Sequence, residues 1–399
     1  MKPRTFTLAS LASVALLSGA ALAQPRLDEE HQRLAQEVAA KAIEFMRAKQ
    51  DAESGGWSVA PPGRQLPAIT ALVVNGLRLN GMPNDDPAVR RGVEFLLAHR
   101  KPDGGIYDTL LPSYNTACAL SALAGIDDPN AIAAIEPAQR FLVSLQWSEE
   151  SGDDPTVARV GPDNPFYGGI GYGQHGRPDL SNLGLALQGL KDSGLDQDSP
   201  AFKRATVFLS RLQMVDEIND MPYADGSEQG GFIYATGPDA AHPTIGESKA
   251  GEIVETLPDG TKVSRLRAYG SMTYTGFKSY VYAGLPRDDE RVQAALNWLR
   301  RHYSLDENPG LGQEGLYYYY VVMARALDAW DEPAIQVTTE DGREESRRWA
   351  EDLVRKLASL QQPDGSFRPI AARWMEGDPE LITAYALIAL GAARGGPVN

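Results

Sequence analysis

The sequence contains few of the residues that form covalent or metal cross-links. Cys118 is its one cysteine, so an intramolecular disulfide and a cysteine-rich zinc site are both excluded. Its 5 histidines show no metal-ligand spacing such as H-x-x-x-H, so no metal or other cofactor is expected. The stability of the folded chain must therefore come from packing.

Basic residues are also in the minority. The 399-residue chain has 38 Lys and Arg against 53 Asp and Glu, which gives a formal net charge of -15. This acidic balance argues against a nucleic-acid partner or an anionic membrane surface as partner. Hydrophobic residues make up 43% of the chain, enough for a large core, and the length alone would allow two or three domains.

Long apolar runs are missing except at the start of the chain. Residues 1–23 carry Lys2 and Arg4, then an apolar run, then the small-residue sequence Ala21-Leu22-Ala23. This order is typical of a secretory signal peptide with an A-x-A cleavage site, and the run is short for a membrane anchor, the alternative. We therefore expect export to the periplasm or beyond, with no transmembrane segment left after cleavage.

What the sequence does contain is a repeated pattern. An amphipathic helix ends in Gln or a basic residue, then come Gly-Gly or Gly-Ser and an aromatic, as in "RAKQDAESGGW", "EQGGFIY" and "LQQPDGSF". A second helix follows, rich in small residues, as in "YNTACALSALAGI" and "LITAYALIALGAA". Because helices that are apolar nearly all round are buried, the second helices should lie inside and the first, with one charged face, outside.

Six such pairs predict an all-α fold, an (α/α)6 toroid that spans residues 24–399 as one domain; an open solenoid is the alternative. Insertions near residues 147–179 and 215–269 interrupt the repeat. The second contains "GEIVETLPDGTKVSRLRAY", an alternation around Pro-Asp-Gly that predicts a small β-hairpin. Such loops form either the rim of a site or surface decoration.

The Gln, Gly-Gly and aromatic ending followed by a small-residue helix resembles the prenyltransferase and squalene-cyclase repeat of terpenoid cyclases and protein prenyltransferases. The resemblance implies a toroid whose ligand enters a funnel at the N-terminal ends of the inner helices. The chemical signatures of that family are missing: no D-x-D-D, no D-D-x-x-D, and no D-x-C near Cys118 for zinc. Catalysis is therefore unproven from the sequence.

Candidate site residues are those at or near the starts of the inner helices. The candidates for acid–base catalysis are Asp378, Glu376, Glu314 and His175. The candidates for ligand binding are Tyr274, Lys278, Tyr317, Trp374, Arg373, Tyr385, Tyr114 and Asn115. Several of these residues also have a structural interpretation. Asp378 precedes Pro379 and would suit a helix N-cap. Glu314 would interact favourably with a helix dipole, and Lys278 would form a buried ion pair.

Two classes of ligand fit these residues. Aromatic side chains suit a cavity for an isoprenoid or other lipid, because their faces stabilise cations, and a buried Asp378 or Glu376 would be the acid. A saccharide is the alternative, in a glycoside hydrolase or polysaccharide lyase that pairs Glu314 with Glu376 or Asp378 and stacks sugars on Trp374. A non-catalytic interaction protein of the cell envelope is the third possibility.

Overall fold

The computed structural model describes residues 25–58, 66–151, 159–173, 176–256, 259–339 and 341–396. The expected signal peptide and His175 lie outside the described residues. None of the helices in the described part combines the length and apolar character that crossing a membrane requires.

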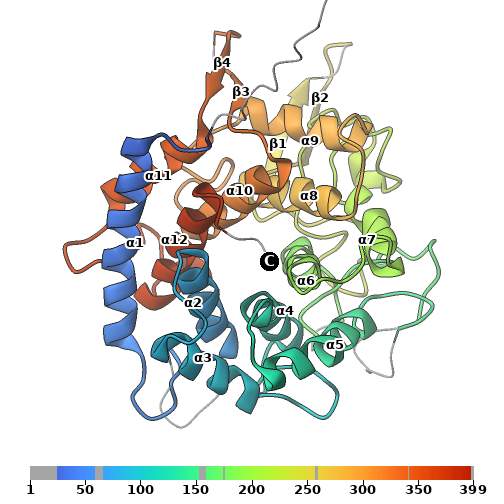
Figure 1. The fold of residues 1–399 in the computed structure, drawn as a ribbon. Coiled ribbons are helices and arrows are strands. Elements are labelled where there is room, and N and C mark those ends of the chain that lie inside the picture. The colour runs from blue at the N-terminus through green and yellow to red at the C-terminus, as the bar shows by residue number, and fades with distance from the viewer. Residues whose placement is uncertain are drawn as a thin grey trace, which may run out of the picture.

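In the described ranges, twelve α-helices form two concentric rings (Figure 1). The outer ring contains α1 (Glu29–Lys49), α3 (Pro87–Ala98), α5 (Pro129–Ser144), α7 (Pro200–Ser210), α9 (Glu290–Arg301) and α11 (Trp349–Leu360). The inner ring contains α2 (Pro67–Leu79), α4 (Pro112–Leu123), α6 (Leu180–Asp192), α8 (Gly270–Tyr282), α10 (Leu316–Trp330) and α12 (Pro379–Ala393). Each inner helix packs on the next, α12 packs back on α2, and α1 packs on α11, so the ring closes. The predicted all-α toroid is confirmed.

The burial of each helix follows its composition. Inner helix α2 buries every residue except Arg78, whereas outer helix α9 buries one stripe that includes Val292, Leu296 and Leu299. Glycines let the inner helices approach closely: a Cβ on Gly184 of α6 would lie 2.1 Å from a methyl carbon of Thr275 on α8. The inner ring is therefore specified by small residues and the outer ring by amphipathic periodicity.

The glutamine of the repeat links successive helix pairs. In four copies its side-chain amide donates to two backbone carbonyls, one from the glycine of its own loop and one from the next outer helix. These sets are Gln50 with Gly55 and Ala88, Gln146 with Gly168 and Ala201, Gln213 with Gly230 and Arg291, and Gln361 with Gly365 and Val38. The last set joins the end of the chain to α1, so the repeat itself closes the ring.

The glycine and the aromatic of each copy also have a structural role. Gly365 has a φ of +85°, and a Cβ there would lie 2.2 Å from the carbonyl oxygen of Lys41 in α1, so only glycine fits. The backbone N–H of Phe367 then donates to the side-chain oxygen of Thr383 in α12, at 3.2 Å. The same bond from the loop to an inner-helix threonine occurs at Trp57, Ile106 and Phe232. The repeat is thus architectural.

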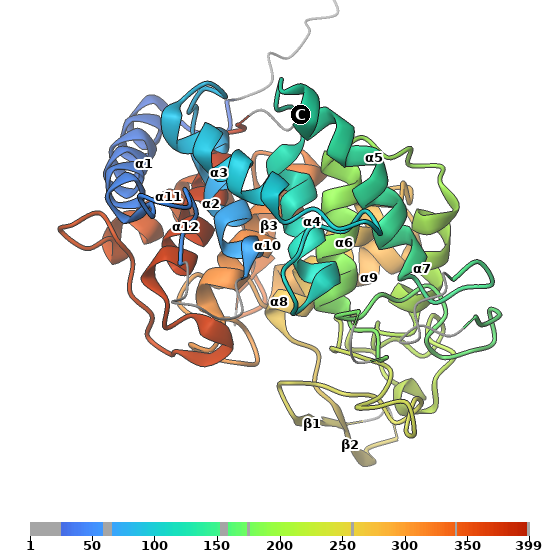
Figure 2. The same ribbon diagram turned by 90° about the horizontal axis from the view of Figure 1, so that it is seen from below.

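The hairpin expected in the second insertion is present: β1 (Glu252–Thr256) pairs antiparallel with β2 (Lys262–Leu266) and projects from one end of the ring (Figure 2). A second hairpin, β3 (Ile335–Thr338) with β4 (Glu344–Arg347), lies between α10 and α11 and was not expected. Two short 3-10 helices, η1 (Pro222–Ala224) and η2 (Arg373–Met375), lie in the connections.

Candidate functional site

A cavity of about 280 Å³ lies at the end of the ring where the inner helices begin. All six inner helices, or the residues just before them, contribute to it. The lining residues are Leu66, Ile69, Leu111, Tyr114, Tyr172, Ser181, Tyr234, Lys249, Tyr269, Ser271, Met272, Gly315, Tyr318, Trp374, Met375, Glu376, Leu381 and Tyr385. The position agrees with the funnel that the sequence resemblance implied.

The third residue of an inner helix lines the cavity in five of the six helices. These residues are Ile69, Tyr114, Met272, Tyr318 and Leu381. The inner helices follow antiparallel outer partners and therefore all start at the same end, so their first turns converge on one axis. Their N-terminal dipole ends also point at this end of the ring, which favours a negative or electron-rich group there.

The lining is rich in aromatic side chains. Six tyrosines and Trp374 contribute to it, together with aliphatic residues such as Leu66, Leu111 and Leu381. Trp374 and Met375 form the rim, where their side chains are 45% and 49% exposed. Both have a left-handed backbone, with φ of 54° and 67°, a conformation that costs non-glycine residues free energy. The rim segment is therefore held against its local preference by its contacts.

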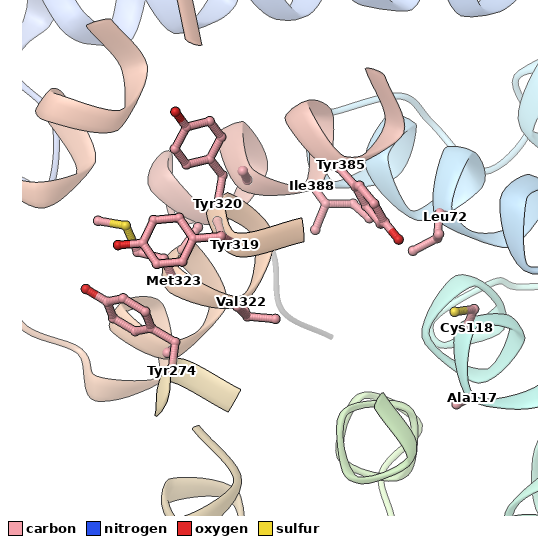
Figure 3. Close-up of a cluster of buried hydrophobic side chains, with 14 of the residues drawn as sticks. Leu72, Ala117, Cys118, Tyr274, Tyr319, Tyr320, Val322, Met323, Tyr385 and Ile388 are labelled. Atoms are coloured by element: carbon pink, nitrogen blue, oxygen red, sulfur yellow. The ribbon is translucent and has the colours of Figure 1, made fainter. Parts of the chain in front are cut away.

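Phenol groups form the bottom of the cavity. The hydroxyl oxygens of Tyr114 and Tyr385 lie 3.3 Å apart, and those of Ser181 and Tyr318 lie 3.0 Å apart. Burial raises the pKa of Tyr114 well above its usual value and that of Tyr318 to about 12, so both groups are neutral near pH 7. Figure 3 shows Tyr385 next to Ile388 and Leu72, which belong to the buried hydrophobic cluster.

Glu376 is the one acidic side chain of the described lining. It is 1% exposed, and its Oε1 accepts the backbone N–H of Tyr318 at 2.8 Å, at the start of α10. Burial raises the pKa of Glu376 to about 7, while the N–H groups of Tyr318, Tyr317 and Leu316 partly oppose this. This carboxyl group is therefore partly protonated near neutral pH, as a general acid or base requires.

One wall of the cavity carries charged groups that come from the insertions. The cations of Arg177 and Lys249 lie 5.2 and 4.7 Å from the ring centre of Tyr234, and Glu247 forms ion pairs with both cations. Asp179, the N-cap of α6, lies behind this wall with a pKa raised by burial. These groups neutralise one another in part, so the wall is polar without a strong net charge.

Four of the residues that the sequence singled out line the cavity: Tyr114, Trp374, Glu376 and Tyr385. Tyr172, Tyr234, Lys249, Ser181 and Tyr318 line it without having been proposed. Tyr318 is the third residue of α10. The third-residue rule above would have selected it.

Two predicted polar residues instead hold the helix starts and their loops in place. Asp378 is the N-cap of α12 and accepts the backbone N–H groups of Glu380 and Leu381, at 2.8 and 3.3 Å. Asn115 accepts the N–H of Ala68, at 2.7 Å, and donates to the carbonyls of Leu110 and Leu111. Both are placed outside the cavity lining because helix starts use their side chains.

Glu314 and Arg373 pair with each other on the surface, with side chains 40% and 45% exposed. The Arg373 guanidinium also lies 4.3 Å from the ring centre of Trp374. This pair fixes the rim segment but does not belong to the cavity lining.

The remaining candidates are placed in the core. Tyr274 packs edge-on against Tyr319, with ring centres 5.6 Å apart. Tyr317 donates through its hydroxyl to the carbonyl of Arg368, at 3.1 Å. Lys278 lies two turns further along α8 than the lining residue Met272, near the opposite end of the ring. The direction of the Tyr274 and Tyr317 side chains and the position of Lys278 along α8 separate these residues from the cavity. Sequence spacing alone does not give this information.

Comparisons with known proteins support the α/α-toroid fold. No protein-family model matches the sequence, and a search of curated proteins finds no match. Solved structures do match: the GH76A alpha-1,6-mannanase from Salegentibacter sp. HEL1_6 has a TM-score of 0.54 and 12% identity, over 90% of this chain and 98% of that chain. An unsaturated glucuronyl hydrolase specific for heparin has a TM-score of 0.54 and 10% identity, over 91% and 97%.

A type II terpene cyclase, MstE from Scytonema, matches with a TM-score of 0.49 and 13% identity, over 91% of this chain and 98% of that chain. At this TM-score and sequence identity, the match gives no information about the function of the chain. The chain therefore has the toroid fold that glycoside hydrolases share, and the resemblance to the prenyltransferase and squalene-cyclase repeat stays a prediction.

Proposed function

We propose that the protein binds a small apolar or amphipathic molecule of the isoprenoid or another lipid class in this cavity, and that Glu376 exchanges a proton with it. One observation carries the proposal: a cavity lined by tyrosines, Trp374 and aliphatic residues contains a single described carboxyl group. We further propose that the protein acts in the periplasm or outside the cell, because residues 1–23 have the residue order of a secretory signal peptide.

The size and lining of the cavity favour a compact ligand that is mostly hydrocarbon. A volume of about 280 Å³ is near the lower end of the usual range for ligand pockets. Each Å² of apolar surface removed from water contributes roughly 25 cal/mol, so the aliphatic and aromatic walls supply binding free energy without further polar contacts. The aromatic faces can also stabilise positive charge that develops on a ligand.

Glu376 limits the chemistry that can take place. A carboxyl group with a pKa of about 7 is a weaker acid than an ordinary glutamate. It suits proton exchange with an oxygen atom, or removal of a proton next to a cation, better than protonation of an isolated alkene. This agrees with the missing D-x-D-D signature, because the family acid that protonates alkenes has no counterpart here.

A saccharide ligand is the second candidate, favoured by structural neighbours that are glycoside hydrolases. Hydrolysis of a glycosidic bond normally uses two carboxyl groups about 5–9.5 Å apart. Of the expected partners of Glu376, Glu314 is paired with Arg373 and Asp378 caps α12. For this reason the lipid ligand ranks first.

The test is a binding comparison on the purified full chain. Farnesol and alpha-1,6-mannotriose are titrated while the melting temperature is measured, and small molecules that copurify are identified by mass spectrometry. Farnesol should raise the melting temperature, because a ligand of the folded state stabilises it. Ile69→Trp, which fills the cavity from α2, should abolish the shift, and Ile132→Trp, at a site 59% exposed on α5, should not.

A shift with mannotriose alone would replace the proposal by the saccharide function, and a shift with neither would favour an interaction protein.

A further inference from the structure

We infer that the ligand carries an oxygen function, a hydroxyl or carbonyl group, which accepts a hydrogen bond from the Tyr114–Tyr385 pair at the bottom of the cavity. This inference rests on the proposed function and makes it more specific. It concerns which end of the ligand enters first and what that end is made of.

The geometry of the pair leaves one donor available. A phenol has one O–H donor and can accept as well, so in the contact between Tyr114 and Tyr385 one hydroxyl donates and the other accepts. Among the described residues, no acceptor is found for the proton of the accepting hydroxyl. A buried donor without a partner costs free energy, so a ligand oxygen placed there would be bound selectively.

The contact within the pair is itself weak. The two oxygens are 3.3 Å apart, whereas O–H···O bonds are usually 2.7–2.8 Å long. Both side chains line the cavity from different helices, Tyr114 from α4 and Tyr385 from α12. A ligand oxygen can therefore accept the free O–H of the pair while the contact between the two hydroxyls is kept.

The neighbouring groups decide the charge state of the partner. The second hydroxyl pair, Ser181 and Tyr318, extends the polar surface, and the rings of Tyr318 and Tyr385 have centres 6.2 Å apart. Burial keeps the phenols neutral, and no described Lys or Arg lies at this pair, so a neutral oxygen fits better than an anion. The apolar rim of Leu66 and Trp374 then receives the hydrocarbon part.

This placement also gives Glu376 a reaction partner. Glu376 lies close enough to Tyr385 to interact with it electrostatically, and both side chains line the cavity. An oxygen held by Tyr114 and Tyr385 would therefore share the cavity with Glu376, the group that exchanges a proton in the proposed function.

The experiment compares farnesol with farnesene, a hydrocarbon of the same carbon skeleton, by titration and thermal shift. The wild-type protein should bind farnesol about tenfold tighter than farnesene, as expected for one additional buried hydrogen bond. The double variant Tyr114→Phe/Tyr385→Phe should lose this preference, and each single variant should lose part of it. The matched control Tyr319→Phe/Tyr320→Phe should keep it, because these hydroxyls donate to the carbonyls of Ser304 and Leu305, away from the cavity.

Each outcome is decisive. Equal binding of farnesol and farnesene to the wild-type protein would overturn the inference and leave the proposed function intact. A preference that survives in the double variant would also overturn it, because the hydrogen bond would come from another group. Failure of both compounds to bind would overturn the proposed function together with the inference. If the double variant does not fold, a partial loss of the preference in the single variants supports the inference, and an unchanged preference in both overturns it.

Discussion

The two ends of the inner ring both bury polar side chains, but they arrange them differently. At the end where the inner helices finish, called here the closed end, Lys278 donates to Gln188 Oε1 at 2.8 Å. Gln188 donates to Asp192 at 2.7 Å, and Asp192 accepts from Arg325 at 2.6 Å. Each of these groups has a protein partner, and none of them belongs to the cavity lining.

At the open end, where the inner helices begin, the polar groups outnumber their protein partners. Tyr114 and Tyr385 share one weak contact, and the partners of Glu376 within the described residues are backbone N–H groups at the start of α10. We infer that a buried polar group marks a binding site where it lines a cavity and keeps hydrogen-bonding capacity for a ligand. By this criterion we expect Lys278, which the sequence suggested for ligand binding and which lies outside the cavity lining, to have a structural role.

The largest effect is expected when one partner of the buried ion pair at the closed end is removed. The side chains of Arg325 and Asp192 are 5% and 8% exposed, so Arg325→Met leaves Asp192 buried without its cation. We expect the free energy of unfolding, measured with urea, to fall by about 3–5 kcal/mol. The double variant Arg325→Met/Asp192→Leu should recover most of this loss, and neither change should alter ligand affinity. A loss below about 1 kcal/mol would mean that the pair is hydrated.

The next largest effect is expected from Lys278, whose contribution to the stability of the protein depends on pH. Burial, with a smaller contribution from Arg325, lowers the pKa of Lys278 from 10.5 to about 7. Between pH 7 and 10.5 the unfolded chain therefore binds more protons than the folded chain, and stability rises with pH. Lys278→Met should remove this rise and stabilise the protein at pH 7 by about 2–3 kcal/mol. Urea unfolding at pH 7 and 9 measures both effects. An unchanged pH slope in the variant would show that Lys278 is not the group that titrates in this range.

Glu376 at the open end should produce the opposite slope in a lower pH window. Its folded pKa of about 7 lies above the usual glutamate pKa of 4.5, so the folded chain binds more protons between these values and stability falls as pH rises. Glu376→Gln should remove this fall and stabilise the protein at pH 8 by about 1–2 kcal/mol, since an amide oxygen can still accept from Tyr318. Unfolding at pH 5 and 8 tests the slope. Proton exchange with the ligand should be lost in the same variant.

The fold could be predicted from the sequence because its determinants are local and repeated. Gln361, Gly365 and Phe367 each make one contact with a neighbouring helix, and the same spacing recurs around the ring. The closing bond from Gln361 to Val38 needs no information beyond the repeat. The β3–β4 hairpin was missed, although Asp341-Gly342 between two short strands is a typical turn.

The site was predicted only in part because it depends on side-chain direction and on loop paths. Glu376, Trp374, Tyr114 and Tyr385 could be proposed from their positions near helix starts, but so could Asp378, which a helix N-terminus uses as its cap. Residues that reach the cavity from the insertions, such as Tyr234 and Lys249, have no periodic pattern that would reveal their direction. Sequence spacing identifies the end of the ring but not which polar groups there lack partners.

Substitution of Glu314 should have the smallest effect on stability, and it tests whether exposed carboxylates outside the cavity lining are structural. The sequence suggested it as a catalytic acid, but it is 40% exposed and paired with Arg373, also exposed, outside the cavity lining. Glu314→Gln should therefore change the free energy of unfolding by about 0.2–1 kcal/mol, and high salt should reduce the difference because an exposed ion pair is screened. Affinity for farnesol should change less than in Glu376→Gln, a substitution of the same kind at a buried position. A larger loss in Glu314→Gln than in Glu376→Gln would show that exposure does not separate structural from functional carboxylates at this end of the ring.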